Sequence, residues 1–237
     1  MFRETHSRSI VKALSYRLAG SLVTVMIVLC FSGKLNMAVG VGVADLGLKV
    51  VTYFLHERLW DRISYGRKRV VPSVVWLTGL SGSGKSTIAD RVHQEIAKRG
   101  FRVERLDGDT IRNLFPSTGF TRPDRDAHIR RVGYLASKLE ANDIFVVASF
   151  VSPYADARNF VRTQCGRFIE VYVSTPIEIC EQRDVKGLYA KARRGELKNF
   201  TGVDDPYEVP EKPELNLDTS TTAVEACVDR VLSLLEI

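Results

Sequence analysis

The sequence is poor in cysteine, and its four cysteines lie far apart. They are Cys30, Cys165, Cys180 and Cys227, and no two of them form a C-x-x-C pair. This spacing argues against a zinc site or a disulfide framework and favours reduced, mostly buried thiols in a cytoplasmic setting. No internal repeat is visible either. The 237 residues have room for one ordinary domain and an appendage.

The larger part of the chain also lacks an excess of positive charge. Residues 72–237 hold twenty-three Lys and Arg against twenty-four Asp and Glu, whereas residues 1–71 hold eleven against four. The net charge of +6 therefore belongs to the N-terminal segment. Because residues 72–237 show no basic stripe, we predict no nucleic-acid partner. The N-terminal charge flanks apolar residues, so a lipid bilayer is the better partner.

Two apolar stretches, residues 13–32 and 37–55, follow one another in that segment. A helix needs about 20 apolar residues to cross a bilayer core, and the first stretch carries one charge, Arg17. The second contains Asp45 and Lys49, whose i, i+4 spacing lets them pair with each other or face the first helix. We predict a transmembrane helical hairpin. An amphipathic hairpin lying on the membrane surface is the alternative.

Basic residues flank this hairpin on both sides, and the turn between the helices offers only Lys34. The flanking set is Arg3, Arg8, Lys12, Arg17, Arg58, Arg62, Arg67, Lys68 and Arg69. By the positive-inside rule, both ends of a spanning hairpin are cytoplasmic. We therefore expect a two-pass protein of the inner (cytoplasmic) membrane with both termini in the cytoplasm. No small-x-small cleavage site follows the first stretch, so we do not expect a signal peptide.

The segments "RSIVKALSYRLAG" and "KVVTYFLHERLWDRI" give the hairpin a family likeness. Over residues 7–63 it resembles a small bacterial two-helix membrane domain of unknown function with an HERxW-type ending. His56 and Glu57 suggest a metal or catalytic pair, but a structural role is the plainer explanation. For Trp60 we expect an anchor at the membrane interface.

A complete phosphate-binding motif follows the N-terminal segment. The residues that match G-x-x-x-x-G-K-[ST] are Gly79, Leu80, Ser81, Gly82, Ser83, Gly84, Lys85 and Ser86, with Thr87 next in the chain. They lie between the β-branched run "SVVWLT" and the helical "TIADRVHQEIAKRG", which is the context this motif requires. Backbone N–H groups and the helix N-terminus bind phosphate here. We expect Lys85 to bridge the β- and γ-phosphates of ATP and Ser86 to be a ligand of Mg²⁺.

Further strand-like runs alternate with helical ones. The runs are 101–107, 144–150 and 167–174, with an amphipathic helix around Ile129–Leu139 and a closing C-terminal helix. This alternation predicts an α/β P-loop kinase fold with a parallel sheet flanked by helices, preceded by the transmembrane α-helical hairpin. The expected domains are a two-helix membrane domain at 1–63, a basic, proline-containing linker at 64–73 and the P-loop domain at 74–237.

The stretch "LDGDTIR" begins as the second of these strands ends. The carboxyl ends of strands in an α/β sheet face the ligand crevice. Asp107 and Asp109 are therefore expected where an acceptor hydroxyl and Mg²⁺ meet. Asp109 would orient or deprotonate the hydroxyl, and Asp107 would serve the metal's water shell or the substrate. A turn with a helix cap is the alternative explanation.

Six motifs together resemble those of adenylyl-sulfate kinases. They are "GLSGSGKST", "LDGDTIR", "GFTRPDRDAHIRR", "SFVSPYADAR", "CEQRDVKGLYAKAR" and "NFTGVDDPYE", in the order and spacing of that family, over roughly residues 72–237. The resemblance implies an enzyme that transfers the γ-phosphate of MgATP to the 3′-hydroxyl of adenosine 5′-phosphosulfate, an alcohol group. The product would be 3′-phosphoadenylyl sulfate, and a homodimer is possible.

The resemblance also implies roles for individual residues. Arg112 and Arg125 match the arginines that grip the phosphosulfate, and Phe120 and Phe200 match the aromatics that sandwich its adenine. Asp109 matches the likelier base of the acidic pair. His128 stands where the family usually has an asparagine that touches the substrate, and it can still donate one hydrogen bond.

Two more positions are expected at the site. Ser152 matches a serine proposed to form a phosphoserine in some members, although direct in-line transfer needs no covalent enzyme. Arg183 begins a lid, which also carries Lys186, that would close over ATP.

Two other functions stay open: a related kinase for another hydroxylated anion, and a non-enzymatic, nucleotide-dependent membrane scaffold. Intact Lys85, Ser86 and Asp109 argue against the scaffold.

Overall fold

The computed structural model describes residues 2–4, 6–31, 36–63, 65, 67–114, 119–184 and 186–237. The chain divides into two compact units, Met1–Val70 and Val71–Ile237. The division falls inside the segment 64–73.

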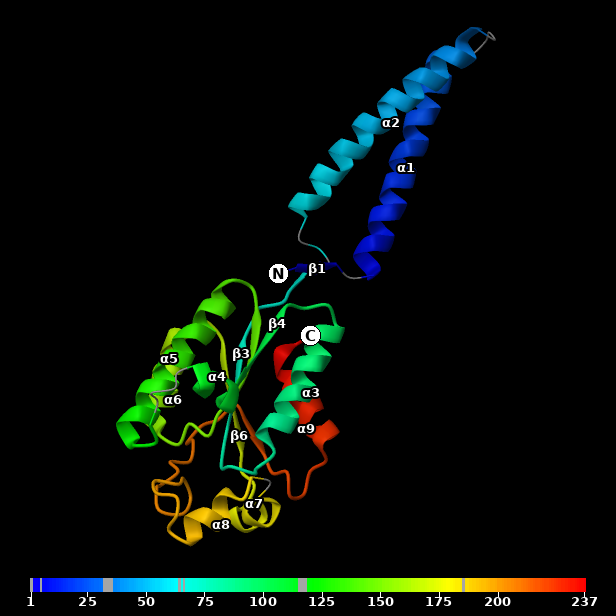
Figure 1. Ribbon diagram of the computed structural model, residues 1–237. Helices are drawn as coiled ribbons and strands as arrows, with labels where there is room; N and C mark the ends of the chain where they lie inside the picture. The colour runs from blue at the N-terminus through cyan, green and yellow to red at the C-terminus, as the bar shows by residue number, and fades with distance from the viewer. Residues whose placement is uncertain are drawn as a thin grey trace. The chain divides into compact units, whose positions relative to one another are not determined.

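The C-terminal unit contains a five-stranded sheet, in the described residues, with the order β4-β5-β3-β6-β7 (Figure 1). All four neighbouring pairs are parallel. The strands are β3 (Val74–Thr78), β4 (Val103–Asp107), β5 (Phe145–Ser149), β6 (Phe168–Val173) and β7 (Leu215–Leu217). Since the strands are parallel, their carboxyl ends lie at one edge, where a ligand site is expected.

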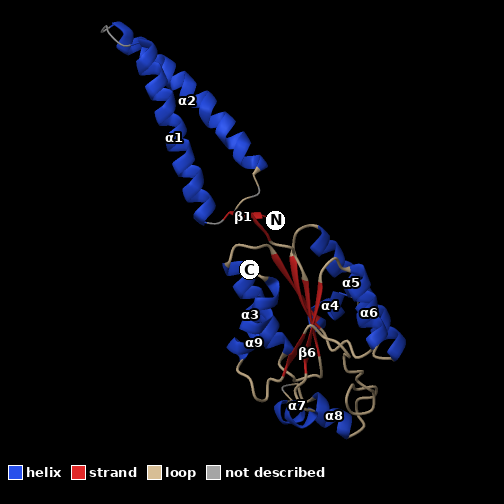
Figure 2. Cartoon of the chain, turned by 180° about the vertical axis from the view of Figure 1, so that it is seen from behind, coloured by secondary structure: helices blue, strands red, loops and turns tan. Residues whose placement is uncertain are grey.

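Helices cover both faces of this sheet, as Figures 1 and 2 show. On one side lie α3 (Lys85–Lys98) and α9 (Val224–Leu235), and on the other lie α5 (Arg122–Ala141) and α6 (Ala155–Gln164). Three short helices follow strands or loops near the carboxyl edge: α4 (Gly108–Leu114), α7 (Ile177–Arg183) and α8 (Leu188–Arg193). This is the layered architecture in which each element buries one apolar face.

The sheet is held by a core whose largest members come from the central strands. Every residue of β3 and β5 is buried. The Trp76 ring stacks on Phe150 with the ring centroids 5.2 Å apart. The start of α5 is fixed by a capping box, in which Thr121 and Asp124 exchange side-chain and backbone hydrogen bonds. The cap fixes the first turn of α5, and residues Arg125 and His128 of this helix line the cavity described below.

The α/β architecture predicted from the sequence is confirmed. The four predicted strand runs appear as β3 to β6, and the predicted helices appear as α3, α5 and α9. Several elements, among them β7 and α6, were not predicted. The strand β7 has only three residues, too few to show a period, and α6 follows directly after a proline-containing turn.

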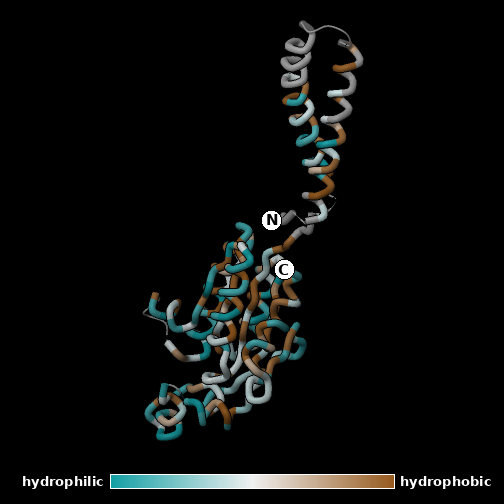
Figure 3. Tube along the Cα trace, turned by 90° about the vertical axis from the view of Figure 1, so that its right-hand side faces the viewer, coloured by the Kyte–Doolittle hydropathy of each residue, from teal (hydrophilic) through white to brown (hydrophobic). Residues whose placement is uncertain are grey.

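The N-terminal unit is a helical hairpin of α1 (His6–Phe31) and α2 (Asn36–Arg62). The short strands β1 (Phe2–Glu4) and β2 (Arg67–Arg69) pair antiparallel beside it. The residues of β2 fall in the predicted linker, and this pairing was not predicted. Apolar side chains are exposed along both helices, and hydrophobic residues recur along them in Figure 3.

A polar cluster joins the two helices of the hairpin. The Ser15 hydroxyl lies 2.8 Å from His56 Nε2, and Trp60 Nε1 donates to the same nitrogen at 3.0 Å. Lys12 pairs with Glu57 at 3.0 Å. The residues of the HERxW ending therefore link α2 to α1, and Trp60 is 7% exposed with its N–H turned to its neighbours.

Within the described residues, no helix combines the length and the hydropathy required of a membrane span. The side chain of Asp45, predicted to pair within the hairpin, and the turn at Lys34 lie outside the described part of the structure.

Candidate active site

A cavity of about 820 Å³ opens at the carboxyl edge of the sheet. Its walls come from the phosphate loop, the end of β4, the loop after β5, and the segment 183–201. Nearly all the predicted site residues line it. Gly79, Leu80 and Ser83 do not, and of these Gly79 and Ser83 are buried. The lining members of the predicted set are Ser81, Gly82, Gly84, Lys85, Ser86, Thr87, Asp107, Asp109, Arg112, Phe120, Arg125, His128, Ser152, Arg183 and Phe200.

The phosphate loop has the backbone that its glycines predict. Gly79, Gly82 and Gly84 have φ angles of 147°, 74° and 93°, which side-chain-bearing residues rarely adopt. A Cβ at Gly79 would lie 2.5 Å from the carbonyl oxygen of Val173. The loop ends as α3 begins at Lys85, so the N-terminus of α3 faces the cavity. Such a helix end favours an anion.

Lys85 is folded back onto the loop. Its Nζ donates to the Leu80 carbonyl at 2.5 Å and to Ser83 Oγ at 3.3 Å. Burial lowers the pKa of Lys85 to about 8, against the opposing carboxylates of Asp107 and Asp109. The ammonium is thus held next to the position where a phosphate would be bound.

Asp107 ends β4 and gathers hydrogen bonds from several neighbours. Its Oδ1 accepts from the Asp109 backbone N–H at 3.0 Å, and its Oδ2 accepts from Ser149 Oγ at 3.3 Å. Ser86 Oγ lies 3.5 Å from the same Oδ2. Carboxylate and hydroxyl oxygens are ligands suited to Mg²⁺. Among the described residues, no group of three or more His, Cys, Asp or Glu is placed to hold a metal ion.

Asp109 lies at the start of α4 with most of its carboxylate exposed. It forms an ion pair with Lys186, which lies between α7 and α8. Asp109, the predicted base, is therefore paired with Lys186, which belongs to the predicted lid. Because the pair is exposed, its contribution to stability is small, whereas its exposure leaves the carboxylate accessible from the cavity.

Arg112 and Arg125 meet around Phe120. The Arg112 guanidinium lies 4.5 Å from the Phe120 ring centroid, and Arg125 Nε donates to the Phe120 carbonyl at 2.9 Å. Arg125 also reaches Thr201 Oγ1 at 3.0 Å. The two arginines thus combine fixed positive charge with an exposed aromatic face, which suits a planar group linked to an anion.

His128 and Phe200 are two buried residues that line the cavity. His128 is 1% exposed, and its ring meets Phe150 edge to face at 6.1 Å. Burial, together with the positive charges of Arg112 and Arg131, lowers the pKa of His128 to about 4. Phe200 packs edge to face on Tyr189, with ring centroids 4.9 Å apart.

Ser152 follows β5 and is 2% exposed. Its hydroxyl accepts from Trp76 Nε1 at 3.1 Å and donates to Thr78 Oγ1 at 2.9 Å. Its φ of 38° is unusual for a residue with a side chain. The Oγ atom is therefore engaged with the core, and the turn's backbone contributes to the cavity wall.

Arg183 lies against the phosphate loop, where its Nη1 is 3.4 Å from the Gly82 carbonyl oxygen. Its Nη1 donates to Thr219 Oγ1 at 2.8 Å, and Thr219 Oγ1 donates to the Ser83 carbonyl at 2.9 Å. Sequence reasoning missed Thr219 because it follows β7, the strand that was not predicted. Had the strand been found, a hydroxyl just past its carboxyl end would have been a candidate.

Sequence reasoning also missed Tyr189. Its hydroxyl donates to the Ser81 carbonyl at 3.0 Å, and its ring belongs to a buried cluster with Cys180, Ala192 and Phe200. The phosphate loop and α8 are therefore tied together directly. The sequence signal that could have identified Tyr189 is its position as an aromatic residue with a hydroxyl group in an otherwise charged helical segment.

The fold and this cavity define a phosphate-loop kinase. A glycine-rich loop runs from a buried strand into a helix, and an acidic strand end and an arginine-aromatic cluster line the same cavity.

The particular family follows from comparison with known proteins. Residues 71–218 match the adenylylsulphate kinase family. An adenylyl-sulfate kinase of Halothermothrix orenii is 52% identical over 163 residues, which are 68% of this chain and 88% of that protein. One of Rippkaea orientalis is 48% identical over 163 residues, 68% of this chain and 90% of that protein. The chain therefore belongs to the adenylylsulphate kinase family and is a phosphotransferase.

Solved structures agree with this family. The Mycobacterium tuberculosis APS kinase CysC, in complex with AMPPNP and APS, matches with a TM-score of 0.68 and 38% identity, over 71% of this chain and 100% of that chain. Residues 10–61 match a second family, described as a predicted membrane protein (DUF2061). The resemblance of both parts of the chain, expected from their motifs, is confirmed.

Proposed function

We propose that the C-terminal unit transfers the γ-phosphate of ATP to the 3′-hydroxyl of adenosine 5′-phosphosulfate, giving 3′-phosphoadenylyl sulfate. The observation that carries this is one cavity holding the phosphate loop, the acidic end of β4 and the cluster of Arg112, Arg125 and Phe120. The related M. tuberculosis enzyme, described with AMPPNP and APS, supports the same pair of ligands.

On the donor side, the phosphate loop from Gly79 to Thr87 would bind the ATP phosphates. Lys85 would leave the Leu80 carbonyl and bridge the β- and γ-phosphates, which its position at the start of α3 allows. Ser86 and Asp107 would hold Mg²⁺, which supplies charge neutralisation for the transferred group. Arg183, fixed on Thr219, would close the nucleotide side.

On the acceptor side, Asp109 would take the proton of the attacking hydroxyl once Lys186 turns from it to the phosphates. Arg112 and Arg125 would bind the phosphosulfate, and Phe120 and Phe200 would contact the adenine. His128 would line this pocket as a neutral group.

For Ser152 we propose a contact role instead of a covalent one. Its hydroxyl is engaged by Trp76 and Thr78 and is almost fully buried. In-line transfer to a bound hydroxyl needs no enzyme nucleophile.

We further propose that the N-terminal hairpin tethers the kinase to the inner membrane as a two-pass anchor, with both termini on the cytoplasmic side. The match of residues 10–61 to a predicted membrane protein supports this. So do the exposed apolar side chains along α1 and α2, which include Leu14, Leu18, Phe54, Leu55 and Leu59. The domain limits 1–63, 64–73 and 74–237, and a homodimer, stay predictions.

The deciding experiment gives the purified full-length protein MgATP and adenosine 5′-phosphosulfate and measures 3′-phosphoadenylyl sulfate. Lys85→Ala is the matched control, because it removes the phosphate-binding ammonium and leaves the acceptor side intact. We expect its kcat to fall at least about 100-fold. No product above this control would refute the proposal. Other nucleotides and sugar acids, at equal concentration, test the alternative of a different hydroxylated anion.

A further inference from the structure

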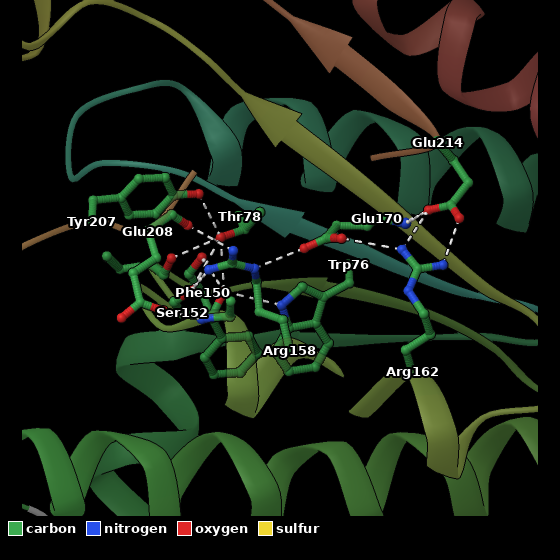
Figure 4. Close-up of polar contacts among 12 residues, drawn as sticks. Trp76, Thr78, Phe150, Ser152, Arg158, Arg162, Glu170, Tyr207, Glu208 and Glu214 are labelled. Atoms are coloured by element: carbon green, nitrogen blue, oxygen red, sulfur yellow. Dashed lines mark hydrogen bonds and ion pairs between the residues drawn. The ribbon is translucent and has the colours of Figure 1, made fainter. Parts of the chain in front are cut away.

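A chain of charged residues outside the predicted site is drawn in Figure 4. At its centre, Arg158 of α6 pairs with Glu170 of β6 through Nε and Oε1, 2.8 Å apart. The two side chains are 2% and 8% exposed. Neither residue lines the cavity. A buried ion pair is weak support for stability by itself, because desolvation offsets the attraction, so this pair needs another explanation.

The other two nitrogens of Arg158 reach two different segments of backbone. Nη1 donates to the Ser152 carbonyl at 2.7 Å, and Nη2 donates to the Glu208 carbonyl at 2.6 Å. The two segments also meet directly, since the Glu208 N–H donates to the Pro153 carbonyl at 2.8 Å. Arg158 therefore joins the turn after β5 to the segment 199–208, as Figure 4 shows for its labelled residues.

Both joined segments form walls of the cavity. Residues 151–153 line it on one side, and residues 197–201 line it on another. The segment 199–208 has another link to the turn after β5, because Tyr154 Oη donates a hydrogen bond to Asp205 at 2.9 Å. A movement of either segment at Arg158 would therefore change the width of the pocket in which Phe200 lies.

The Ser152 turn needs such a support. A residue with a side chain at a φ of 38° is strained, and such strain persists only where the surroundings hold it. The hydroxyl is held by Trp76 and Thr78, and the carbonyl is held by Arg158. In Figure 4 these partners converge on Ser152 from the sheet and from α6.

Glu170 fixes the direction of the Arg158 fork. Its second oxygen pairs with Arg162 at 3.1 Å, and Arg162 pairs with Glu214 at 2.5 Å. The Glu170 N–H in turn donates to Glu214 at 2.7 Å. With its carboxylate held on both sides, Glu170 sets the plane of the guanidinium, whose rigid geometry then aims two N–H groups at the two carbonyls.

We propose that Arg158 is a positioning residue for phosphoryl transfer, which sets the separation of the Ser152 turn and the segment 199–208 and thereby the placement of the acceptor. The inference rests on the proposed function of the same cavity. It predicts an effect mainly on the acceptor, because the hydrogen-bond partners of the Arg158 guanidinium in the described residues are Ser152, Glu170 and Glu208, and none of these belongs to the phosphate loop.

The first test is Arg158→Lys in the full-length protein. Lysine keeps the charge that Glu170 needs but cannot span both carbonyls with a planar fork. We expect kcat/KM for adenosine 5′-phosphosulfate to fall about 10- to 100-fold, since a shift of about 1 Å in the bound geometry has effects of that size. The KM for ATP should stay within about two-fold of wild type, because interactions on the donor side are retained.

Arg162→Lys is the matched control. It makes the same change on the same helix and at the same carboxylate, but the Arg162 side chain contacts neither wall segment. We expect its kcat/KM to stay within about three-fold of wild type. An equal loss in both lysine variants would overturn the inference, and so would an unchanged Arg158→Lys enzyme.

A second pair of variants separates positioning from folding. Arg158→Met leaves Glu170 buried and half-paired and is expected to lower the thermal midpoint, whereas Arg158→Met with Glu170→Met removes both charges and should restore much of it. Positioning predicts that kcat/KM for the acceptor stays low in the double variant. Recovery of kcat/KM together with the midpoint would assign Arg158 a merely structural role. The wild-type rate relative to Lys85→Ala tests the proposed function separately.

Discussion

His128 is the buried side chain whose charge state decides how the acceptor pocket responds to acid. Burial and the nearby Arg112 and Arg131 all disfavour the imidazolium, so the pKa of His128 lies near 4. At neutral pH the ring is uncharged, and the pocket's positive charge comes from the arginines alone. A phosphosulfate would then meet a fixed charge that does not titrate between pH 6 and 8.

This environment predicts how His128 links stability to pH. As the pH falls from 6.5 to 4, the unfolded chain takes up a proton on this histidine that the folded protein excludes. Wild type therefore loses free energy of unfolding over that window and gains none above pH 6.5 from this group. His128→Asn lacks this titratable group. As the pH is lowered from 7 to 5, the urea midpoint of the variant should therefore rise relative to the urea midpoint of wild type. A difference in midpoint that is the same at both values would contradict the assignment.

At the scale of elements, the phosphate loop and the lid formed by α7 and α8 behave as one assembly. The lid's buried cluster includes Phe200, and the Tyr189 hydroxyl donates to the Ser81 carbonyl of the loop. Ordering of the lid and shaping of the phosphate site are thereby coupled. Closure over a nucleotide would use a contact that already exists.

Tyr189→Phe tests this coupling by removing one hydroxyl and keeping the ring on Phe200. A hydrogen bond of this kind contributes about 1 kcal/mol, so we expect the KM for ATP to rise about five-fold. The KM for adenosine 5′-phosphosulfate should change little. Tyr134→Phe is the control, since Tyr134 lies on α5 and is 56% exposed. Equal KM values for ATP in the two variants would show that the loop does not depend on this contact. Steady-state kinetics with each substrate varied in turn give the comparison.

The elements that the sequence could predict are those in which a periodic hydrophobic pattern or an apolar run extends over at least five residues. β3 to β6 and the three predicted helices each have at least five residues of clear pattern. β7 has three residues, and the pairing of β1 with β2 joins residues more than sixty positions apart, so neither has a local signal. The HERxW ending was noticed, but its link to Ser15 depends on how α1 lies beside α2.

The same limit holds for the cavity. The phosphate loop and the acidic end of β4 were predicted because each is a short motif attached to one strand. Arg158 was not, because its three partners lie at Ser152, Glu170 and Glu208, and only the fold brings those together. Long-range polar networks of this kind carry no pattern in the sequence near any one member.

At the scale of the whole molecule, the chain joins two units of different surface chemistry. The C-terminal unit has its own buried core, built around Trp76, Val146 and Ile129. Relatives that consist almost entirely of this unit are adenylyl-sulfate kinases, since the match covers 88% of the H. orenii protein. The hairpin instead exposes apolar side chains along both helices. Catalysis and membrane attachment are therefore expected to be separable.

A fragment of residues 71–237 tests that separation against the full-length protein. We expect the fragment to keep kcat and both KM values within about two-fold of wild type, because no residue assigned to the cavity lies before Val71. It should stay in the supernatant when membranes are pelleted. The full-length protein should pellet and resist alkaline carbonate if the proposed hairpin crosses the bilayer core, a distance that needs about 20 helical residues. Release of the full-length protein by carbonate would favour a hairpin lying on the surface. A fragment that folds but has lost activity would show that the hairpin contributes to the kinase site itself.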